Sequence, residues 1–275
     1  MKKILLITLL LGMIESAASA YDFMVKGVYY TITDPRKRTV EVTHWEEQTN
    51  GWGQPQRVLH HHNCTHHHSE EDTLTEEHLR LIQMDEEAKE REKTAYTGKV
   101  VVPSHVWHKG VRYKVTGVGD GCFYSRRLLT EVKLPAGITY IGRSAFENCV
   151  ALRAIRIPSS VTCIDIAAFR RCLAITEMVL PDNLTTLGKY AISHCVNLSF
   201  VRMSPNIVSF PGNAFFHSPN LKVIELPHRI PPEVRNNEGL TMDFKKISFR
   251  VPAQALTLYQ QDPYWSKQHV LTIQK

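Results

Sequence analysis

The densest group of side chains with metal-binding chemistry is a histidine-rich tract. Six imidazoles and one thiol lie within nine residues: His60, His61, His62, Cys64, His66, His67 and His68. Neutral imidazole and thiolate are ligands that Zn, Cu and Ni accept readily. The spacing matches no closed structural zinc site. Two interpretations therefore stay open: capture of Zn, Cu or Ni by the tract, with the rest of the chain as its scaffold, and a solvated loop that binds metals only weakly and without a role.

The six cysteines form the second group with chemical potential. Three of them recur at intervals of 23 residues: Cys149, Cys172 and Cys195. If such units stack as parallel rungs, like side chains lie about 4.8 Å apart. A disulfide needs Cβ atoms about 3.5–4.5 Å apart with converging directions. We therefore expect an internal column of free thiols, with Cys122 also in the core. This reasoning assigns no state to Cys64 or Cys163.

The same interval organises the second half of the chain. From Val115 to Arg229 the sequence divides without gaps into five units of 23 residues. The first position of each unit is aliphatic, and the ninth is Phe in four units and Ile192 in the fourth. One unit cannot bury its apolar face alone, so neighbours must stack into a continuous core. The repeat predicts a solenoid with a parallel strand ladder joined by tight turns or short helical pieces.

The repeat residues resemble a known family. The pattern I-G-x-x-A-F-x-x-C-x-x-L-x-x-I-x-I-P, clear from Ile141 to Pro158, is similar to the BspA-type leucine-rich repeat of bacterial surface and secreted proteins. The segments 21–32, 98–115 and 230–265 resemble that family's flanking parts. The departures are Ile192 for Phe, Pro211 for Gly, and one large insertion. The resemblance implies a binding or adhesion role, with no catalytic residue to carry over.

The N-terminus has the layout of a secretory signal. Lys2 and Lys3 precede an apolar run from Ile4 to Met13, and small residues follow at Ala18 and Ala20. We expect cleavage after Ala20 and a secreted, envelope or cell-surface location. The full division predicted is a signal peptide at 1–20, a β-rich N-terminal cap at 21–114, the solenoid at 115–229 and a C-terminal cap at 230–275. An insertion at about 44–94 interrupts the N-terminal cap.

Charge is distributed unevenly among these segments. The chain of 275 residues has a net charge of +6. Residues 69–93 carry ten acids and four bases, whereas residues 94–275 carry 22 bases and 11 acids. Thr73 and Glu76 fit a capping box for a surface helix from about 75 to 91 in the acidic segment. The basic solenoid favours an acidic protein or glycan partner, and export makes nucleic acid an unsuitable one.

Motifs of catalysis are absent from the sequence. It has no G-x-S-x-G, no H-E-x-x-H and no P-loop. We therefore expect no enzyme activity, and a hydrolase whose site no motif marks is the remaining catalytic alternative. The better candidates are outward-facing residues of the repeat strands, because alternate residues of a strand point to opposite faces. The predicted partner-binding residues are Lys133, Arg156, Phe200 and Arg202, and an ordinary solvated face is the alternative.

Overall fold

The structure is a computed structural model that describes residues 23–25, 28–43, 48–49, 55–56, 97–235 and 244–273. The predicted signal peptide, the His60–His68 tract and the predicted acidic helix lie outside these ranges. Among the described residues, no helix is long and apolar enough to cross a membrane.

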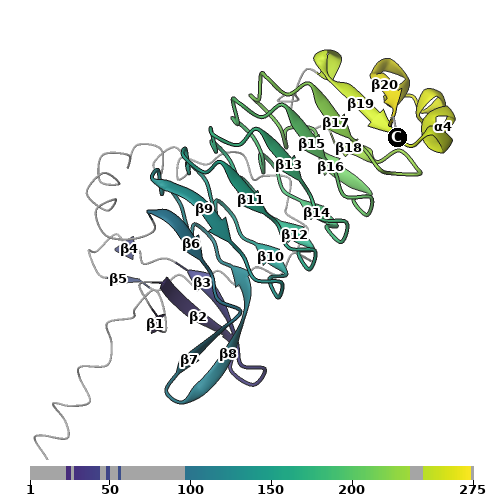
Figure 1. Cartoon of the computed structure of the whole chain (residues 1–275). Helices are drawn as coiled ribbons and strands as arrows, with labels where there is room; N and C mark the ends of the chain where they lie inside the picture. The colour runs from purple at the N-terminus through teal and green to yellow at the C-terminus, as the bar shows by residue number, and fades with distance from the viewer. Residues whose placement is uncertain are drawn as a thin grey trace, which may run out of the picture.

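The chain winds into a parallel β-solenoid, as the repeat predicts (Figure 1). One side carries a first ladder, whose strands lie in two sheets. The first sheet contains β6 (Gly98–Val101), β9 (Leu129–Lys133) and β11 (Ala154–Arg156). The second contains β13 (Glu177–Val179), β15 (Phe200–Arg202), β17 (Val223–Glu225), β19 (Ser248–Val251) and β20 (His269–Thr272).

A second ladder runs along the other side of the coil. Its continuous part consists of β8 (Val111–Val118), β10 (Tyr140–Ile141), β12 (Cys163–Ile164) and β14 (Thr186–Leu187). The strands β16 (Ser209–Pro211) and β18 (Glu233–Arg235) pair separately. In β10 and β12, Tyr140 lies opposite Cys163, so paired residues are 23 positions apart. The predicted period is thus the length of one turn of the solenoid.

The ladders extend beyond the five gap-free units. Before the first unit, β6 pairs with β9, and after the last, β17 pairs with β19 and β19 with β20. The division into caps and repeats stays a prediction, because strand pairing alone does not define where one domain ends.

Antiparallel strands join the N-terminal end of the second ladder. These are β1 (Phe23–Val25), β2 (Val28–Asp34) and β3 (Thr39–Thr43), and β3 lies parallel to β8. The strand β7 (His105–His108) forms a hairpin with β8. A separate two-stranded pairing joins β4 (Gln48–Thr49) and β5 (Pro55–Gln56).

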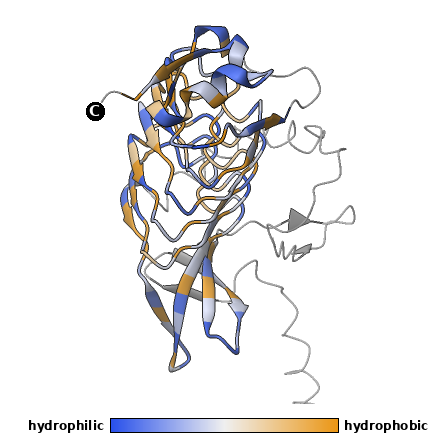
Figure 2. Cartoon of the chain, turned by 90° about the vertical axis from the view of Figure 1, so that its right-hand side faces the viewer, coloured by the Kyte–Doolittle hydropathy of each residue, from blue (hydrophilic) through white to orange (hydrophobic). Residues whose placement is uncertain are grey.

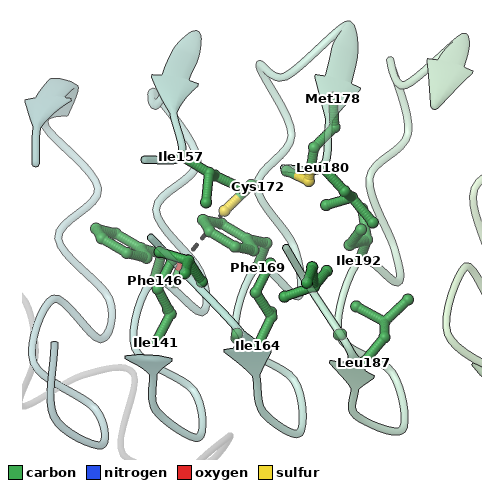
Figure 3. Packing of buried hydrophobic residues seen from close by; sticks show 14 of the residues in the cluster. Ile141, Phe146, Ile157, Ile164, Phe169, Cys172, Met178, Leu180, Leu187 and Ile192 are labelled. Carbon is green, nitrogen blue, oxygen red and sulfur yellow. Dashed lines mark hydrogen bonds between the residues drawn. The ribbon is translucent and has the colours of Figure 1, made fainter. Parts of the chain in front are cut away.

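The core consists of columns of like side chains between the two ladders (Figure 3). The ring centroids of Phe123 and Phe146 are 5.0 Å apart, and those of Phe146 and Phe169 are 5.2 Å apart, with nearly parallel planes. Ile192 occupies the next place in this column and ends the stack of rings. A strict sequence period therefore produces identical neighbours in space, as expected for a stacked array.

The expected thiol column is confirmed. Cys122, Cys149, Cys172 and Cys195 are buried and free. The Cys172 thiol donates to the Phe146 carbonyl oxygen at 3.1 Å, and Cys149 and Cys195 do the same to Phe123 and Phe169. Cys163 differs from them because it is disulfide-bonded.

The chain reverses through turns rather than helical pieces between the two ladders. Two positions of the first four turns, and one position of the fifth, lie in the left-handed region of backbone space. The first holds Gly121, Ser144, Ala167 and Tyr190, and the second holds Ser125, Asn148, Arg171, His194 and His217. Most of these residues are not glycine, so the turns accept local strain that the surrounding ladder hydrogen bonds must offset.

The C-terminal residues close the last rung with aromatic packing. After β19, the chain forms η2 (Ala253–Ala255), α4 (Leu256–Gln261) and η3 (Trp265–Lys267), while η1 (Phe244–Lys246) precedes β19. Trp265 and Tyr259 are buried. The indole Nε1 of Trp265 donates to the carbonyl oxygen of Pro232 at 2.8 Å. This bond ties the last short helix to the segment after the fifth repeat unit.

Candidate binding surface

The outward-facing residues of the first ladder form a row along the solenoid. In its first sheet, Val101 lies opposite Lys133, and Lys133 lies opposite Arg156. In its second sheet, Val179 lies opposite Arg202. The row continues through the register pairs Arg202 with Glu225, Glu225 with Arg250, and Arg250 with Leu271. A parallel ladder therefore presents one side chain per turn at a fixed spacing.

Lys133 and Arg156 form the most positive part of the row. Both side chains are exposed, and neither makes an ion pair with another described residue. Their backbones lie about 4.8 Å apart because they are register partners in neighbouring strands. The nearby Glu131 carboxylate binds the Lys99 ammonium at 2.8 Å. Two adjacent cations thus face solvent without a described counter-ion, as expected for a surface that meets an anionic group.

Arg202 differs from the other two basic residues because acids flank it. Its guanidinium lies 2.8 Å from Asp182 and 3.3 Å from Glu225. Its side chain is only 30% exposed. The exposed Val179 occupies the row between Arg156 and Arg202, and the ladder itself is interrupted between β11 and β13. The structure therefore brings Lys133 and Arg156 together but leaves Arg202 in a separate, charge-compensated place.

Phe200 lies on the same side of the ladder, in the neighbouring outward row. It is half-buried between its register partners Glu177 and Val223. Its role in partner binding stays a prediction. Larger fractions of Val101 and Val179, 57% and 54%, are exposed in the row that contains Lys133.

The arginines of the turns do not all add charge to the surface. Arg170 is buried, and its guanidinium lies 3.4 Å from the carboxylate of Glu147. The Ser144 hydroxyl donates to the same carboxylate at 2.6 Å. Arg170 therefore contributes no cation to the surface. Glu147 and Arg170 are 23 residues apart, so neighbouring turns place them side by side.

The histidines within the described ranges offer no metal centre. No group of three or more His, Cys, Asp or Glu in that part of the chain could hold a metal ion. His194 and His217 stack with centroids 5.0 Å apart. Burial, with Arg170 and His217 nearby, lowers the pKa of His194 to about 4, so its ring is neutral at pH 7. Metal capture by the His60–His68 tract stays a prediction from the sequence.

One exposed aromatic residue was not singled out by the sequence patterns. Trp107 of β7 is 65% exposed, and its register partner on β8 is Arg112. Val106 and Tyr113 are buried, whereas Trp107 and Arg112 beside them are exposed. This alternation along the two strands is the signal that could have located Trp107. It lies outside the 23-residue units, where repeat reasoning gives no expectation.

Comparisons with known proteins identify the repeat. Residues 115–233 match, in six copies, a family model described as the BspA type leucine rich repeat region. None of the curated proteins matches the chain. Eight solved chains are similar to it, and three serve as examples. A leucine-rich repeat protein from Bacteroides ovatus ATCC 8483 has 19% identity and a TM-score of 0.47, over 93% of this chain and 53% of that one.

The other two structures are similar at a comparable level. The pneumococcal vaccine antigen PcpA has 21% identity and a TM-score of 0.47, over 64% of this chain and 42% of its own. A leucine-rich repeat protein from T. pallidum has 18% identity and a TM-score of 0.46, over 74% of this chain and 84% of its own. The chain thus spans about half the length of the first two.

Proposed function

Residues 115–233 are a BspA-type leucine-rich repeat region, and from that premise we propose that the chain is an exported, non-enzymatic binding protein. Its partner is a protein or glycan with an acidic surface, recognised by the outward row of the first ladder. The repeat family suggests a protein-interaction scaffold, and no catalytic evidence accompanies it. A stacked array suits this role because its rungs hold side chains at fixed intervals over a long surface.

The observation that carries the proposal is the pair Lys133 and Arg156. Cross-strand cations without a described counter-ion repel one another, so the pair has no benefit for the free protein. An acidic group of a partner would interact with both cations at once. The exposed Val101 and Val179 at either end of the pair add apolar contact area. Cations beside apolar side chains are a common composition at protein interfaces.

Export rests on the first 20 residues of the sequence. Lys2 and Lys3, the apolar run that follows and the small residues Ala18 and Ala20 together support cleavage of a secretory signal. The test is to express the full chain, recover it outside the cytoplasm and sequence its N-terminus. Tyr21 as the first residue supports export, and Met1 as the first residue of all recovered protein contradicts it.

Charge reversal tests the binding surface. The full chain, the variant Lys133→Glu/Arg156→Glu and the matched control Lys222→Glu/Arg229→Glu are immobilised and exposed to bacterial envelope and host-cell material. Lys222 and Arg229 are exposed but lie outside the row, so the two variants have equal net charge. We expect the control to retain the wild-type partner and the row variant to lose about tenfold or more of it, since close charge pairs at interfaces are energetically coupled. Equal retention by both variants would overturn the proposed surface.

A further inference from the structure

A second basic surface lies where two hairpins project from the N-terminal end of the solenoid. The first is β2–β3, and the second is β7–β8. Figures 1 and 2 show both projecting from the same end, and Figure 2 shows their hydrophilic tips. The backbone N–H of Lys114 donates to the carbonyl oxygen of Arg38 at 2.8 Å, so the two hairpins are directly joined. Residues from both hairpins therefore form one surface.

Cations dominate this surface. The β2–β3 turn exposes Arg36, Lys37 and Arg38, and its single acid, Asp34, lies 3.6 Å from the ammonium of Lys37. The β7–β8 hairpin exposes Lys109, Arg112 and Lys114, and its residues 105–118 include no acid. We call these six cations together with Trp107 the hairpin surface. Its excess of positive charge is complementary to a polyanion.

Trp107 lies in the middle of the cations and its indole is open. Trp107 pairs with Arg112 and His105 with Lys114, so these four side chains share one face of the hairpin. The opposite face is apolar and packs on the core through Val106 and Tyr113. The indole is 65% exposed and stacks on no other described aromatic ring. A paired strand therefore presents a flat, uncovered ring beside an arginine.

From this arrangement we propose that the hairpin surface binds an acidic polysaccharide, one whose sugars carry carboxylate or sulfate groups. The C–H bonds of a sugar ring pack against the electron-rich face of an indole. Arg112 binds a carboxylate or sulfate through paired N–H donors, and Lys114, about 7 Å further along the strand, binds the next anionic group. The cations of the β2–β3 turn, Arg36, Lys37 and Arg38, provide further contacts for a longer polysaccharide. This site is independent of the partner proposed for Lys133 and Arg156, which lie on β9 and β11.

The hairpin tips argue against a lipid bilayer as the ligand. A hairpin that enters a membrane needs apolar residues at its tip, because unsatisfied polar groups in hydrocarbon are costly. Here the tips hold Lys109 and Gly110 in one hairpin and Arg36 and Lys37 in the other. Trp107 lies on the side of the hairpin, where it meets a ligand that runs along the strands.

The test measures binding of a heparin-derived hexasaccharide to the full chain by calorimetry and by tryptophan fluorescence. Neutral dextran, linear polyphosphate of equal charge and phosphatidylglycerol vesicles are the comparison ligands. The variants are Trp107→Ala, Trp107→Phe and Arg112→Ala/Lys114→Ala, with Lys222→Ala/Arg229→Ala as the matched control and Lys133→Ala/Arg156→Ala as a separate variant of the first ladder. All altered side chains are exposed, and circular dichroism with a thermal melt checks that each variant folds.

We expect Trp107→Ala and Arg112→Ala/Lys114→Ala each to raise the Kd for the hexasaccharide about tenfold, and Trp107→Phe to restore most of the loss. The control variant should keep the wild-type Kd within twofold. Loss of hexasaccharide binding only in Lys133→Ala/Arg156→Ala would assign glycan binding to the first ladder and overturn this inference. Equal binding of polyphosphate, with no effect of Trp107→Ala, would reduce the surface to unspecific charge and also overturn it. Tighter binding of the vesicles would replace the polysaccharide with a membrane.

Discussion

The thiol of Cys172 donates a hydrogen bond to the carbonyl oxygen of Phe146, 26 residues earlier, at 3.1 Å (Figure 3). The same bond recurs in the rungs before and after it, and in the fifth unit Ser218 replaces the cysteine and donates to Ile192 at 3.4 Å. A serine thus occupies the place of the thiol in this protein. The column is defined by the position of a small donor over the carbonyl of the preceding rung.

Substitutions at Cys172 should therefore depend on the donor. Cys172→Ala removes both the hydrogen bond and the volume of the sulfur, and we expect it to lower the free energy of unfolding by about 1–2 kcal/mol. Cys172→Ser keeps a donor and should cost less. Urea denaturation followed by circular dichroism measures both values. A serine variant less stable than the alanine variant would contradict the role of the bond.

Burial should also keep the thiols of the column protonated at alkaline pH until the protein unfolds. Burial raises the pKa of Cys149 and Cys195 to about 12, from an ordinary value of 9.0. The folded state then keeps protons that the unfolded state releases, so this contribution to stability is complete below pH 9 and is lost as pH rises toward 12. Each thiol lowers the free energy of unfolding by up to about 1.4 kcal/mol per pH unit in that range.

Two measurements check the thiol column. At pH 8, iodoacetamide should label none of the four free cysteines in the native protein and all four in guanidinium chloride, read by mass spectrometry. Between pH 9 and 11, the variant Cys149→Ala/Cys195→Ala should lose stability less steeply than wild type. Rapid labelling of the native column would show that its thiols are accessible.

Replacement of two adjacent alanines by glycine should change the free energy of unfolding in opposite directions. Ala167 has a φ of 54°, in the left-handed region, whereas the φ of Ala168 is not positive. Ala167→Gly relieves strain of about 1 kcal/mol and should raise the free energy of unfolding. Ala168→Gly removes a buried methyl group and adds freedom to the unfolded chain, so it should lower that energy by about 1 kcal/mol. Denaturant titration measures the free energy of unfolding of both variants. A loss of stability in both would contradict the claim that Ala167 is strained.

Charge reversal at Lys133 should stabilise the protein while it weakens binding. Lys133→Glu converts repulsion with the cross-strand Arg156 into attraction, worth about 0.5 kcal/mol. The thermal midpoint should rise slightly at low salt and the gain should shrink in 0.5 M salt, because screening weakens exposed ion pairs. Lys222→Glu serves as the control. A lower midpoint for Lys133→Glu at every salt concentration would mean that Lys133 already has a stabilising role.

Periodicity explains which features could be predicted from the sequence. Residues at equal offsets become neighbours, so the stacked phenylalanines and the free thiols follow from the interval of 23 alone. The pair Glu147 and Arg170 also obeys this interval, so its ion pair was accessible to the same reasoning. The ion pair of Arg202 with Asp182 could not be predicted in this way. These residues are 20 positions apart, so they do not share an offset, and only the course of the turn between them brings them together. Trp107 belongs to a hairpin outside the period.

The interruptions of the two ladders are staggered along the solenoid. The first ladder breaks between β11 and β13, where β10 and β12 remain paired in the second. The second ladder breaks between β14 and β16, where β15 and β17 remain paired in the first. A tensile load along the solenoid axis therefore meets paired strands in one ladder wherever the other ladder is interrupted. This arrangement shares the force between the two ladders, because no turn of the described solenoid is unpaired in both of them.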